Sequence, residues 1–318
     1  MDDIELGVLI PIGQAQWGAG TDTRELLDFA VQAEELGYSS LWVNDSLLTP
    51  RIEALTMLAA VAPLTSRVTL GTAALLPVLR RPVQAAQALA SIDVLSGGRL
   101  VLTVGAGFPG RLGEPQHGLS NVPWERRFTR LDETVALWRQ MWDAPHGGGS
   151  FDGSLLKFGQ LPPVIAPFRP GGPPVWLGGA SPSALRRTGR RYDGWMPYPP
   201  LADDYAAGLT AVRAAAVEAG RDPAAVTPAL FVSVVVTDSV GRGRELLAAF
   251  AEASYGMPLE QLERIQALAA GPVDVVAEKL RGYVAAGARH LAVRIATTSL
   301  ETQREQLKHI IELKGCLQ

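Results

Sequence analysis

The chain has 318 residues, of which 47% are hydrophobic and 19% are charged, which is enough apolar sequence for one large α/β domain or two small ones. The net charge of −3 and the lack of any basic run argue against nucleic acid or a membrane surface as a partner. The single cysteine, Cys316, rules out a disulfide framework and a thiolate metal site.

The N-terminal sequence MDDIELGVLIP lacks the basic region of a signal peptide. No apolar stretch reaches the roughly 18 residues that a membrane span needs. We therefore expect a cytoplasmic protein.

Short apolar runs alternate with longer helical patterns along the whole chain. Strands are predicted at 4–10, 39–43, 67–72, 99–104, 173–179, 193–197, 229–238 and 289–295. Helical patterns are predicted at 21–37, 52–63, 82–98, 125–143, 181–191, 202–219, from 240 onwards and at 299–315. Thr21 or Thr23 is expected to cap the first helix, Gly37 to end it, and Pro82 to begin the third.

The strands are continuous apolar runs, which is typical of strands covered on both faces. Eight strand–helix units in one chain predict a (β/α)8 barrel, a TIM barrel, as a single domain over 1–318. Insertions are expected near 106–125, 145–160 and 254–272, the second as a small hairpin, and the longest connections are candidate lids. A doubly wound sheet is the alternative, but it would need an early phosphate-binding fingerprint.

The stretch LVLTVGAGFPGR contains G-x-G-x-x-G at Gly105, Gly107 and Gly110. The following RLGEPQHGLSNVP carries two prolines and two more glycines, so we expect no helix to start there, and a dinucleotide site is disfavoured. Glycine at a barrel rim lets backbone approach a flat ligand, although it also serves a plain tight turn.

Three segments carry a resemblance to a known family: LWVNDSLL (41–48), residues 67–107, and PPVWLGGASPSALRRTGRRYDGW (173–195). The chain resembles the bacterial luciferase-like superfamily, barrel oxidoreductases that use FMN or the deazaflavin coenzyme F-420. The resemblance runs in order over nearly the whole chain.

The resemblance implies that Asp45 contacts the coenzyme, whereas from the residue alone it could equally be a loop carboxylate or a helix cap. The catalytic His that commonly follows in deazaflavin enzymes is Ser46 here, and a hydroxyl cannot hold and return a proton near neutral pH. Thr72, Ala73 and Ala74 match a bulge that often contains a non-prolyl cis peptide and presses on one face of the ring. Plain strand-end packing is the alternative at these three residues.

Gly105, Ala106 and Gly107 are expected to approach the cofactor with bare backbone. Deazaflavin-dependent sugar-phosphate dehydrogenases place a catalytic Glu where this chain has Phe108, which cannot take a proton. Phe108 is therefore expected to line an apolar substrate pocket with Trp17 and Trp124, unless these aromatics only pack a lid.

The sequence GGASPSALRR looks like a phosphate-binding strand–helix junction made by Gly178, Gly179, Ala180 and Ser181, with Ser181 as N-cap. Basic residues nearby could meet an anionic cofactor tail, or could form a solvated helix face; they are Arg186, Arg187, Arg190 and Arg191. Arg294, at the end of the last strand, is a candidate for binding an anionic substrate group.

No metal site is expected, because the histidines at 117, 146, 290 and 309 lack ligand spacing. No G-x-S-x-G elbow supports a serine hydrolase.

The sequence thus predicts an oxidoreductase that uses coenzyme F-420 or FMN on a small, partly apolar organic substrate. Asp45 and the small-residue bulge favour hydride transfer with F-420. The alternatives are an FMN-dependent monooxygenase supplied by a separate flavin reductase, a non-catalytic flavin-binding protein, and a cofactor-free barrel hydrolase. The resemblance also implies a homodimer.

Overall fold

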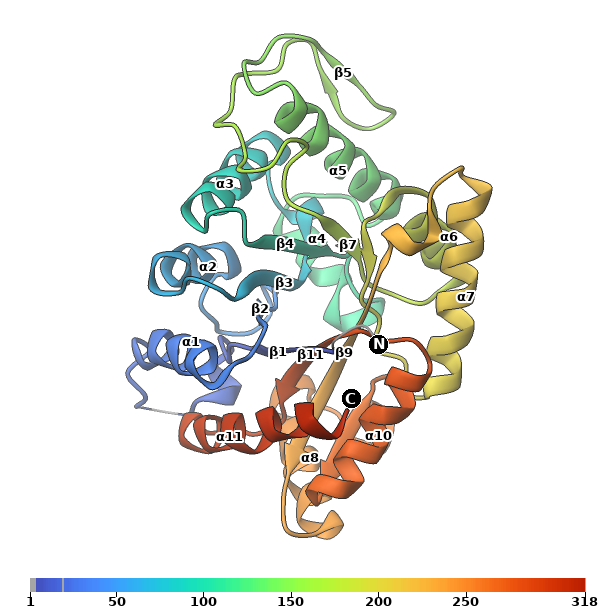
Figure 1. Cartoon of the computed structure of the whole chain (residues 1–318). Helices are drawn as coiled ribbons and strands as arrows, with labels where there is room; N and C mark the ends of the chain where they lie inside the picture. Colours follow the sequence, from blue (N-terminus) through green and yellow to red (C-terminus); the bar gives the residue numbers. More distant parts are fainter. Residues whose placement is uncertain (1–3, 19, 318) are drawn as a thin grey trace.

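The computed structural model describes residues 4–18 and 20–317, and its centre is a closed barrel of eight parallel strands surrounded by helices (Figure 1). The barrel strands are β1 (Glu5–Leu9), β2 (Ser40–Val43), β3 (Thr69–Leu75), β4 (Leu100–Val104), β7 (Val175–Leu177), β8 (Gly194–Trp195), β9 (Thr227–Val236) and β11 (His290–Ile295). Neighbours pair in the order β9-β11-β1-β2-β3-β4-β7-β8, and β8 pairs again with β9. The predicted (β/α)8 barrel is confirmed, and the doubly wound alternative is wrong because that sheet would be open.

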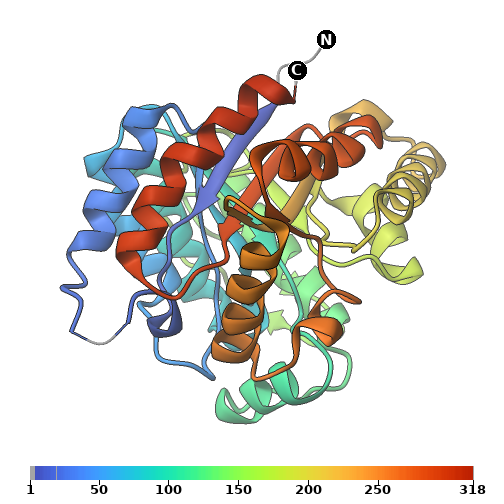
Figure 2. The ribbon, with the colours of Figure 1, turned by 90° about the horizontal axis from the view of Figure 1, so that it is seen from below.

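Helices follow the strands and cover the barrel, as predicted. They are α1 (Glu25–Leu36), α2 (Ala54–Val61), α3 (Pro82–Leu95), α5 (Arg127–Asp143), α6 (Pro182–Arg191), α7 (Ala202–Glu218), α8 (Val240–Tyr255), α10 (Val273–Ala285) and α11 (Leu300–Cys316). Short 3-10 turns occur at Gln14–Gln16, Ala62–Leu64, Pro77–Leu79, Gly110–Leu112 and Pro223–Ala225. Helices α1 and α11, from opposite ends of the chain, lie side by side (Figure 2).

The predicted helix signals are confirmed at Gly37, which ends α1 with φ +95°, and at Pro82, the first residue of α3. The cap predicted for α1 is wrong. Its N-cap is Arg24, which makes no side-chain cap, because the Thr21 hydroxyl donates to the Trp17 carbonyl instead.

The insertions contain more regular structure than predicted. The hairpin is confirmed as β5 (Phe151–Asp152) and β6 (Lys157–Phe158), which pair antiparallel. The expectation that no helix starts after Gly110 is wrong, because α4 (Glu114–Leu119) forms there with a proline in its first turn, where no N–H is needed. The connection near 254–272 contains α9 (Leu259–Leu262) and an extra strand, β10 (Leu268–Gly271), which pairs with β9.

Large side chains fill the interior of the barrel below the carboxyl ends of the strands, a layer that we call the floor. The rings of Trp42 and Trp176 lie 5.4 Å apart, and each lies 5.3 Å edge-on from the His290 ring. Trp42 Nε1 donates to Ser40 Oγ (2.7 Å), which lies 2.8 Å from His290 Nε2. Burial lowers the pKa of His290 to about 4, so the ring is neutral at pH 7 and packs as part of this floor.

Three inward-facing glycines make room for the tryptophans. A Cβ on Gly71 would lie 2.2 Å from a ring carbon of Trp42, and one on Gly194 would lie 2.4 Å from a ring carbon of Trp176. A Cβ on Gly7 would lie 1.9 Å from Ser40 Oγ. The floor is therefore packed large against small across neighbouring strands.

None of the helices in the described part of the chain has the length and hydropathy needed to cross a bilayer.

Candidate active site

Four predicted site segments meet at the rim formed by the carboxyl ends of the strands. Asp45 follows β2, residues 72–74 end β3, residues 105–107 follow β4, and residues 178–181 follow β7. Because these four strands are consecutive in the sheet, their ends are neighbours. The rim is where active sites of such barrels lie.

The end of β3 is irregular. The peptide bond between Ala73 and Ala74 is cis, as the resemblance implies, and the pairing with β4 shifts register between Thr72 and Leu75. Thr72 is fully buried, and its hydroxyl donates to the Thr103 carbonyl (2.8 Å). Ala74 is half-buried, so this tip offers accessible main chain next to a buried hydroxyl.

The ends of β4 and β7 leave space around their glycines. Gly105 N donates to the Leu75 carbonyl (2.9 Å), and Gly178 N donates to the Val104 carbonyl (3.0 Å). A Cβ on Gly105 would be 3.9 Å from the nearest atom, the Ala74 Cβ, and one on Gly178 would be 3.6 Å from the Val104 oxygen. The strand tips are therefore linked by backbone bonds, and both glycines have room for a Cβ at ordinary contact distance.

Gly107 and Gly179 both have φ +93°, which only glycine adopts without strain. Ala106 is buried, and its carbonyl lies 3.1 Å from His117 Nε2. The Gly179 carbonyl accepts from Trp195 Nε1 (2.9 Å). A side chain thus contacts the backbone of each turn: His117 at Ala106 and Trp195 at Gly179.

The segment after β7 begins α6 as predicted. Ser181 Oγ accepts from Ala184 N (3.3 Å), Pro182 occupies the first turn, and Ala180 and Ser181 are exposed. The free amides of this helix start face solvent at the rim, where they can bind an anion.

The arginines of α6 are mostly engaged elsewhere. The ion pairs are Arg187–Asp132 (2.8 Å), Arg191–Asp132 (3.4 Å) and Arg190–Glu218 (3.7 Å), and Arg186 is exposed. Asp132 on α5 therefore holds Arg187 and Arg191 together.

Two arginines at the start of α5, which sequence reasoning missed, carry no such pair. The Nε atoms of Arg127 and Arg130 are buried without a partner in the part of the chain that the structure describes. The Arg127 guanidinium lies 3.8 Å from the Trp124 ring centroid and 4.5 Å from that of Phe128, and Arg187 contacts the same Phe128 ring. Burial lowers the pKa of Arg127. Unlike Arg187, Arg190 and Arg191, these two cations form no ion pair within the described residues.

Asp45 is held in a charged network at the end of β2. Its carboxylate accepts from Leu76 N (3.0 Å) and from Arg80 Nη1 (2.5 Å), and Arg80 Nη2 also reaches Glu53 (2.5 Å). Burial disfavours the Arg80 charge, but the hydrogen bonds with Asp45 and Glu53 outweigh it and raise the pKa of Arg80. Asp45 thus fixes the β3 tip through the Leu76 amide.

Ser46 has a local role in the same loop. Its hydroxyl accepts from Leu48 N (3.2 Å), and the adjacent Leu47 N donates to Gln116 Oε1 (2.7 Å) on α4. The loop after β2 is therefore tied to the loop after β4.

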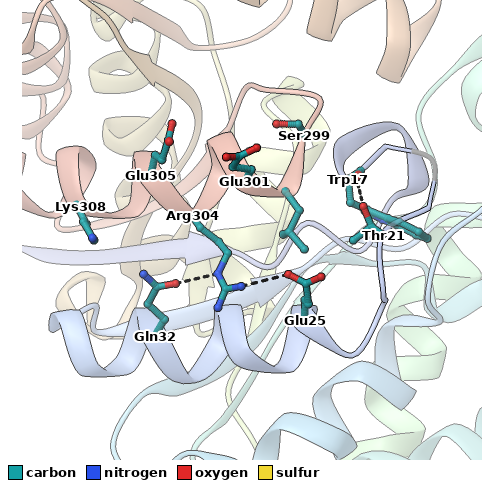
Figure 3. Close-up of a pocket in the computed structure, with 10 residues that line it drawn as sticks. Trp17, Thr21, Glu25, Gln32, Ser299, Glu301, Arg304, Glu305 and Lys308 are labelled. Carbon is teal, nitrogen blue, oxygen red and sulfur yellow. Dashed lines mark hydrogen bonds and ion pairs between the residues drawn. The ribbon is translucent and has the colours of Figure 1, made fainter.

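The predicted aromatic pocket residues divide between two places. Phe108 is 37% exposed, and Trp124 lies edge-on to His117 at 4.8 Å, next to Gly107. Trp17 lies elsewhere: it lines a groove of about 480 Å³ on the outer surface between α1 and α11 (Figure 3). Only Phe108 and Trp124 stand beside the β4 tip.

The groove between α1 and α11 is polar, and several of its side chains bond to one another. Arg304 donates to Gln32 (3.2 Å) and to Glu25 (3.2 Å), as Figure 3 shows, and Glu301 and Lys308 also line it. Most of the residues that line this groove lie on α1 and α11, and none belongs to the four segments that meet at the strand ends. We therefore place the site at the rim.

A second cavity, of about 430 Å³, opens at the rim between β1, β2 and β11. Residues 13–16 and Gly18, the loop 44–51, the end of α8 and Arg294 line it. Of the predicted residues, the structure places Arg294 here, across β1 from the tips of β2 and β3.

Among residues 4–18 and 20–317, no three His, Cys, Asp or Glu side chains gather closely enough to hold a metal ion.

Sequence reasoning missed Arg51, Arg80 and Tyr255 as well as the α5 arginines. Arg80 binds a residue 35 positions away, and Arg51 and Tyr255 meet at one cavity from opposite parts of the chain. No local pattern marks such residues, because only closure of the barrel brings them together.

Comparison with known proteins identifies the family of this chain. The sequence profile of the luciferase-like monooxygenase family matches residues 4–290. A phthiodiolone/phenolphthiodiolone dimycocerosates ketoreductase of Mycobacterium tuberculosis is 31% identical over 67% of this chain, and the match covers 60% of that relative's length. An F-420-dependent glucose-6-phosphate dehydrogenase of Kineococcus radiotolerans is 29% identical over 84% of this chain and 86% of its own.

Solved structures share the fold at low sequence identity. An F-420-dependent secondary alcohol dehydrogenase, in complex with an F-420–acetone adduct, matches with a TM-score of 0.84 and 17% identity over 99% of both chains. The FMN-bound oxygenating constituent of 3,6-diketocamphane monooxygenase from Pseudomonas putida matches with a TM-score of 0.75 and 18% identity over 98% of both chains.

Proposed function

Since the chain belongs to the luciferase-like monooxygenase family, we propose that it is an oxidoreductase that transfers hydride between coenzyme F-420 and a small organic substrate. The observation that carries this proposal is the row of small residues at three neighbouring strand ends, those of β3, β4 and β7, with the cis peptide Ala73–Ala74 among them. The named relatives with F-420 chemistry favour F-420 over FMN.

The rim fits a flat ring with an anionic tail. Ala74, Gly105 and Gly178 are half-buried and have small or no side chains, so a planar group could lie against their backbone. The start of α6, with Arg127 and Arg130 nearby, offers amide donors and cations for a phosphate.

The bound coenzyme would supply the hydride chemistry, and the protein's residues orient it. Asp45 holds the β3 tip in place through the Leu76 amide and Arg80. Ser181 keeps the α6 amides directed at the rim. Ser46 can donate or accept a hydrogen bond at its Oγ but cannot store a proton, so the chain's residues serve mainly to bind and position.

The decisive experiment is a fluorescence titration of the purified protein with F-420 and, separately, with FMN. We expect micromolar binding of F-420 and none of FMN. The reverse result would overturn hydride transfer and make the protein a monooxygenase that takes reduced FMN from a separate reductase. Binding of neither coenzyme would overturn both.

Matched variants test the placement. Gly178→Leu and Ala74→Leu should abolish coenzyme binding without changing the circular dichroism spectrum, because their side chains would fill the space for the ring. Gly241→Leu on α8, where a Cβ meets nothing within 4 Å, should bind normally. Unchanged affinity in the first two variants would place the ring elsewhere.

Two further parts of the proposal concern turnover and assembly. Tight binding of F-420 with no turnover of any reductant would indicate a non-catalytic binding protein. We also propose a homodimer, by resemblance to the family, which sedimentation equilibrium would measure directly.

A further inference from the structure

The rim cavity between β1, β2 and β11 has an unbalanced charge. Arg51 and Arg294 both line it, and none of its other lining residues is acidic. Its volume of about 430 Å³ is sufficient for a small molecule. The lining of the cavity therefore carries two positive charges and no carboxylate.

Arg294 is a buried cation whose partners are all neutral. It points into the barrel from β11 and is 4% exposed. Its guanidinium donates to Ser233 Oγ (2.7 Å), to Gln266 Oε1 (2.8 Å) and to the Tyr255 hydroxyl. The rings of Phe231, Phe250 and Tyr255 surround it at 4.7–5.1 Å. Nowhere in residues 4–18 and 20–317 does a carboxylate approach it within 4 Å.

Arg51 is similar. Nη1 donates to Asn44 Oδ1 (2.9 Å) and Nη2 to Thr49 Oγ1 (2.5 Å), while the buried Nε has no partner among the described residues. Burial lowers the pKa of Arg51, the Asp45 and Tyr255 charges raise it, and the Arg294 charge lowers it again. Arg51 and Arg294 line the same cavity, so their positive charges repel each other.

The guanidinium group of Arg294 is costly to bury without a counter-ion, because arginine stays charged and the aromatic rings offset only part of the lost hydration. The half-buried Arg51 adds a second positive charge to the same cavity. Asp45, the carboxylate whose charge reaches Arg51, is already bonded to Arg80 and the Leu76 amide. An external anion would compensate both arginines at once.

We propose that this cavity binds an anionic oxygen group of the substrate, a carboxylate or a phosphate, between Arg51 and Arg294. This inference rests on the proposed function, because it takes the molecule in the cavity to be the hydride partner. The loop after β2 carries both Asp45 and Arg51, so the cavity adjoins the rim assigned to the coenzyme. The two arginines select anionic substrates, and guanidinium groups bind carboxylate and phosphate with equally good geometry.

The test uses three aromatic probes of similar shape: phenyl phosphate, benzoate and the neutral benzamide. Isothermal titration calorimetry at fixed ionic strength measures each one against the protein, with and without saturating coenzyme. We expect phenyl phosphate or benzoate to bind and benzamide not to bind, and the stronger of the two anions identifies the group. Equal binding of benzamide overturns the proposal.

Variants assign the site. Arg51→Gln and Arg294→Gln should each weaken binding of the anion by about tenfold or more, since each removes a charge-assisted hydrogen bond. Arg294→Lys, which keeps the charge but loses the fork, should fall in between. Arg242→Gln, on the exposed face of α8, is the matched control and should bind as the wild type does. Circular dichroism checks folding, and if Arg294→Gln does not fold, Arg51→Gln decides.

The remaining outcomes either overturn the anion site or overturn only the proposed function. Wild-type affinity in folded Arg51→Gln or Arg294→Gln overturns the proposal. Competition between the anion and F-420 or FMN also overturns it, because the arginines would then bind the coenzyme's own phosphate or tail. Arginine-dependent anion binding by a protein that binds neither coenzyme would leave the anion site standing and overturn only the proposed function.

Discussion

The floor of the barrel and its rim use glycine in opposite ways. On the floor, Gly71 and Gly194 stand where a Cβ would overlap a tryptophan ring by more than an ångström of normal contact distance. At the rim, Gly105 and Gly178 stand where a Cβ would touch nothing closer than 3.6 Å. Floor glycines are thus required by packing, whereas a Cβ would fit at the rim glycines.

This difference separates stability from binding. A residue that fills space on the floor must displace a ring in a close-packed interior. A residue that fills space at the rim displaces only what binds there. Four experiments test this separation, in order of decreasing effect.

The largest effect is expected for Gly71→Ala. Its Cβ would lie 2.2 Å from Trp42 Cζ3, so unfolding in urea should show a loss of about 3 kcal/mol or more. Combining it with Trp42→Phe, which shortens the ring, should recover part of that loss. If Gly71→Ala alone is as stable as the wild type, the packing account of the floor is wrong.

The next effect is a pH dependence set by His290. The pKa of His290 is about 4 in the folded protein and about 6.5 when unfolded. Between these pH values the unfolded chain binds a proton that the native state excludes, so stability falls as the pH falls from 6.5 to 4, by about 3 kcal/mol in total.

The variant His290→Gln isolates this contribution, because its amide can still bond to Ser40 but does not titrate. We expect a shallower fall in urea-measured stability below pH 6.5 than in the wild type. The exposed His309→Gln is the control and should follow the wild type. Parallel curves for all three proteins would contradict a neutral, buried His290.

At the rim, Gly105→Leu should lower the free energy of unfolding by much less than Gly71→Ala does, because its Cβ would lie 3.9 Å from the nearest atom. Coenzyme affinity should fall about a hundredfold, equivalent to roughly 2.7 kcal/mol, as measured by fluorescence titration. A large loss of stability with unchanged affinity would reverse the roles assigned to floor and rim.

The smallest effect compares two serine caps of equal geometry. Ser181 and Ser239 each accept a bond of 3.3 Å from a backbone amide, so replacing either with Ala should cost about 1 kcal/mol in thermal or urea unfolding. Only Ser181→Ala should also weaken coenzyme binding, by a few fold. Equal affinity in both variants would remove α6 from the site.

The barrel could be predicted from the sequence because strands covered on both faces appear as unbroken apolar runs. Predicted and observed strands agree within a few residues, and Gly37, Pro82 and Ser181 mark helix ends through their own backbone chemistry. Helix α4 and strand β10 could not be predicted, because tertiary contacts fix them: Gln116 bonds to Leu47, and β10 needs β9 beside it.

The candidate site also has one part that local sequence predicts and one part that only tertiary contacts create. The strand ends 72–74, 105–107 and 178–181 are short local motifs, and parallel topology makes them neighbours. Arg51 and Arg294 lie 243 positions apart in the chain, so no local sequence pattern reveals the cavity that they share.

The edge at which the barrel closes is built in two pieces. Strand β8 bonds to β9 at Thr227 and Pro228, whereas β10, from the connection after α8, bonds to β9 farther up, at 233–236. Gln266, just ahead of β10, holds Arg294. Lengthening or replacing the 254–272 connection can therefore remodel the wall that faces a reactant and leave the ring of strands sealed. The segment that determines selectivity can therefore change without altering the barrel that holds the catalytic residues.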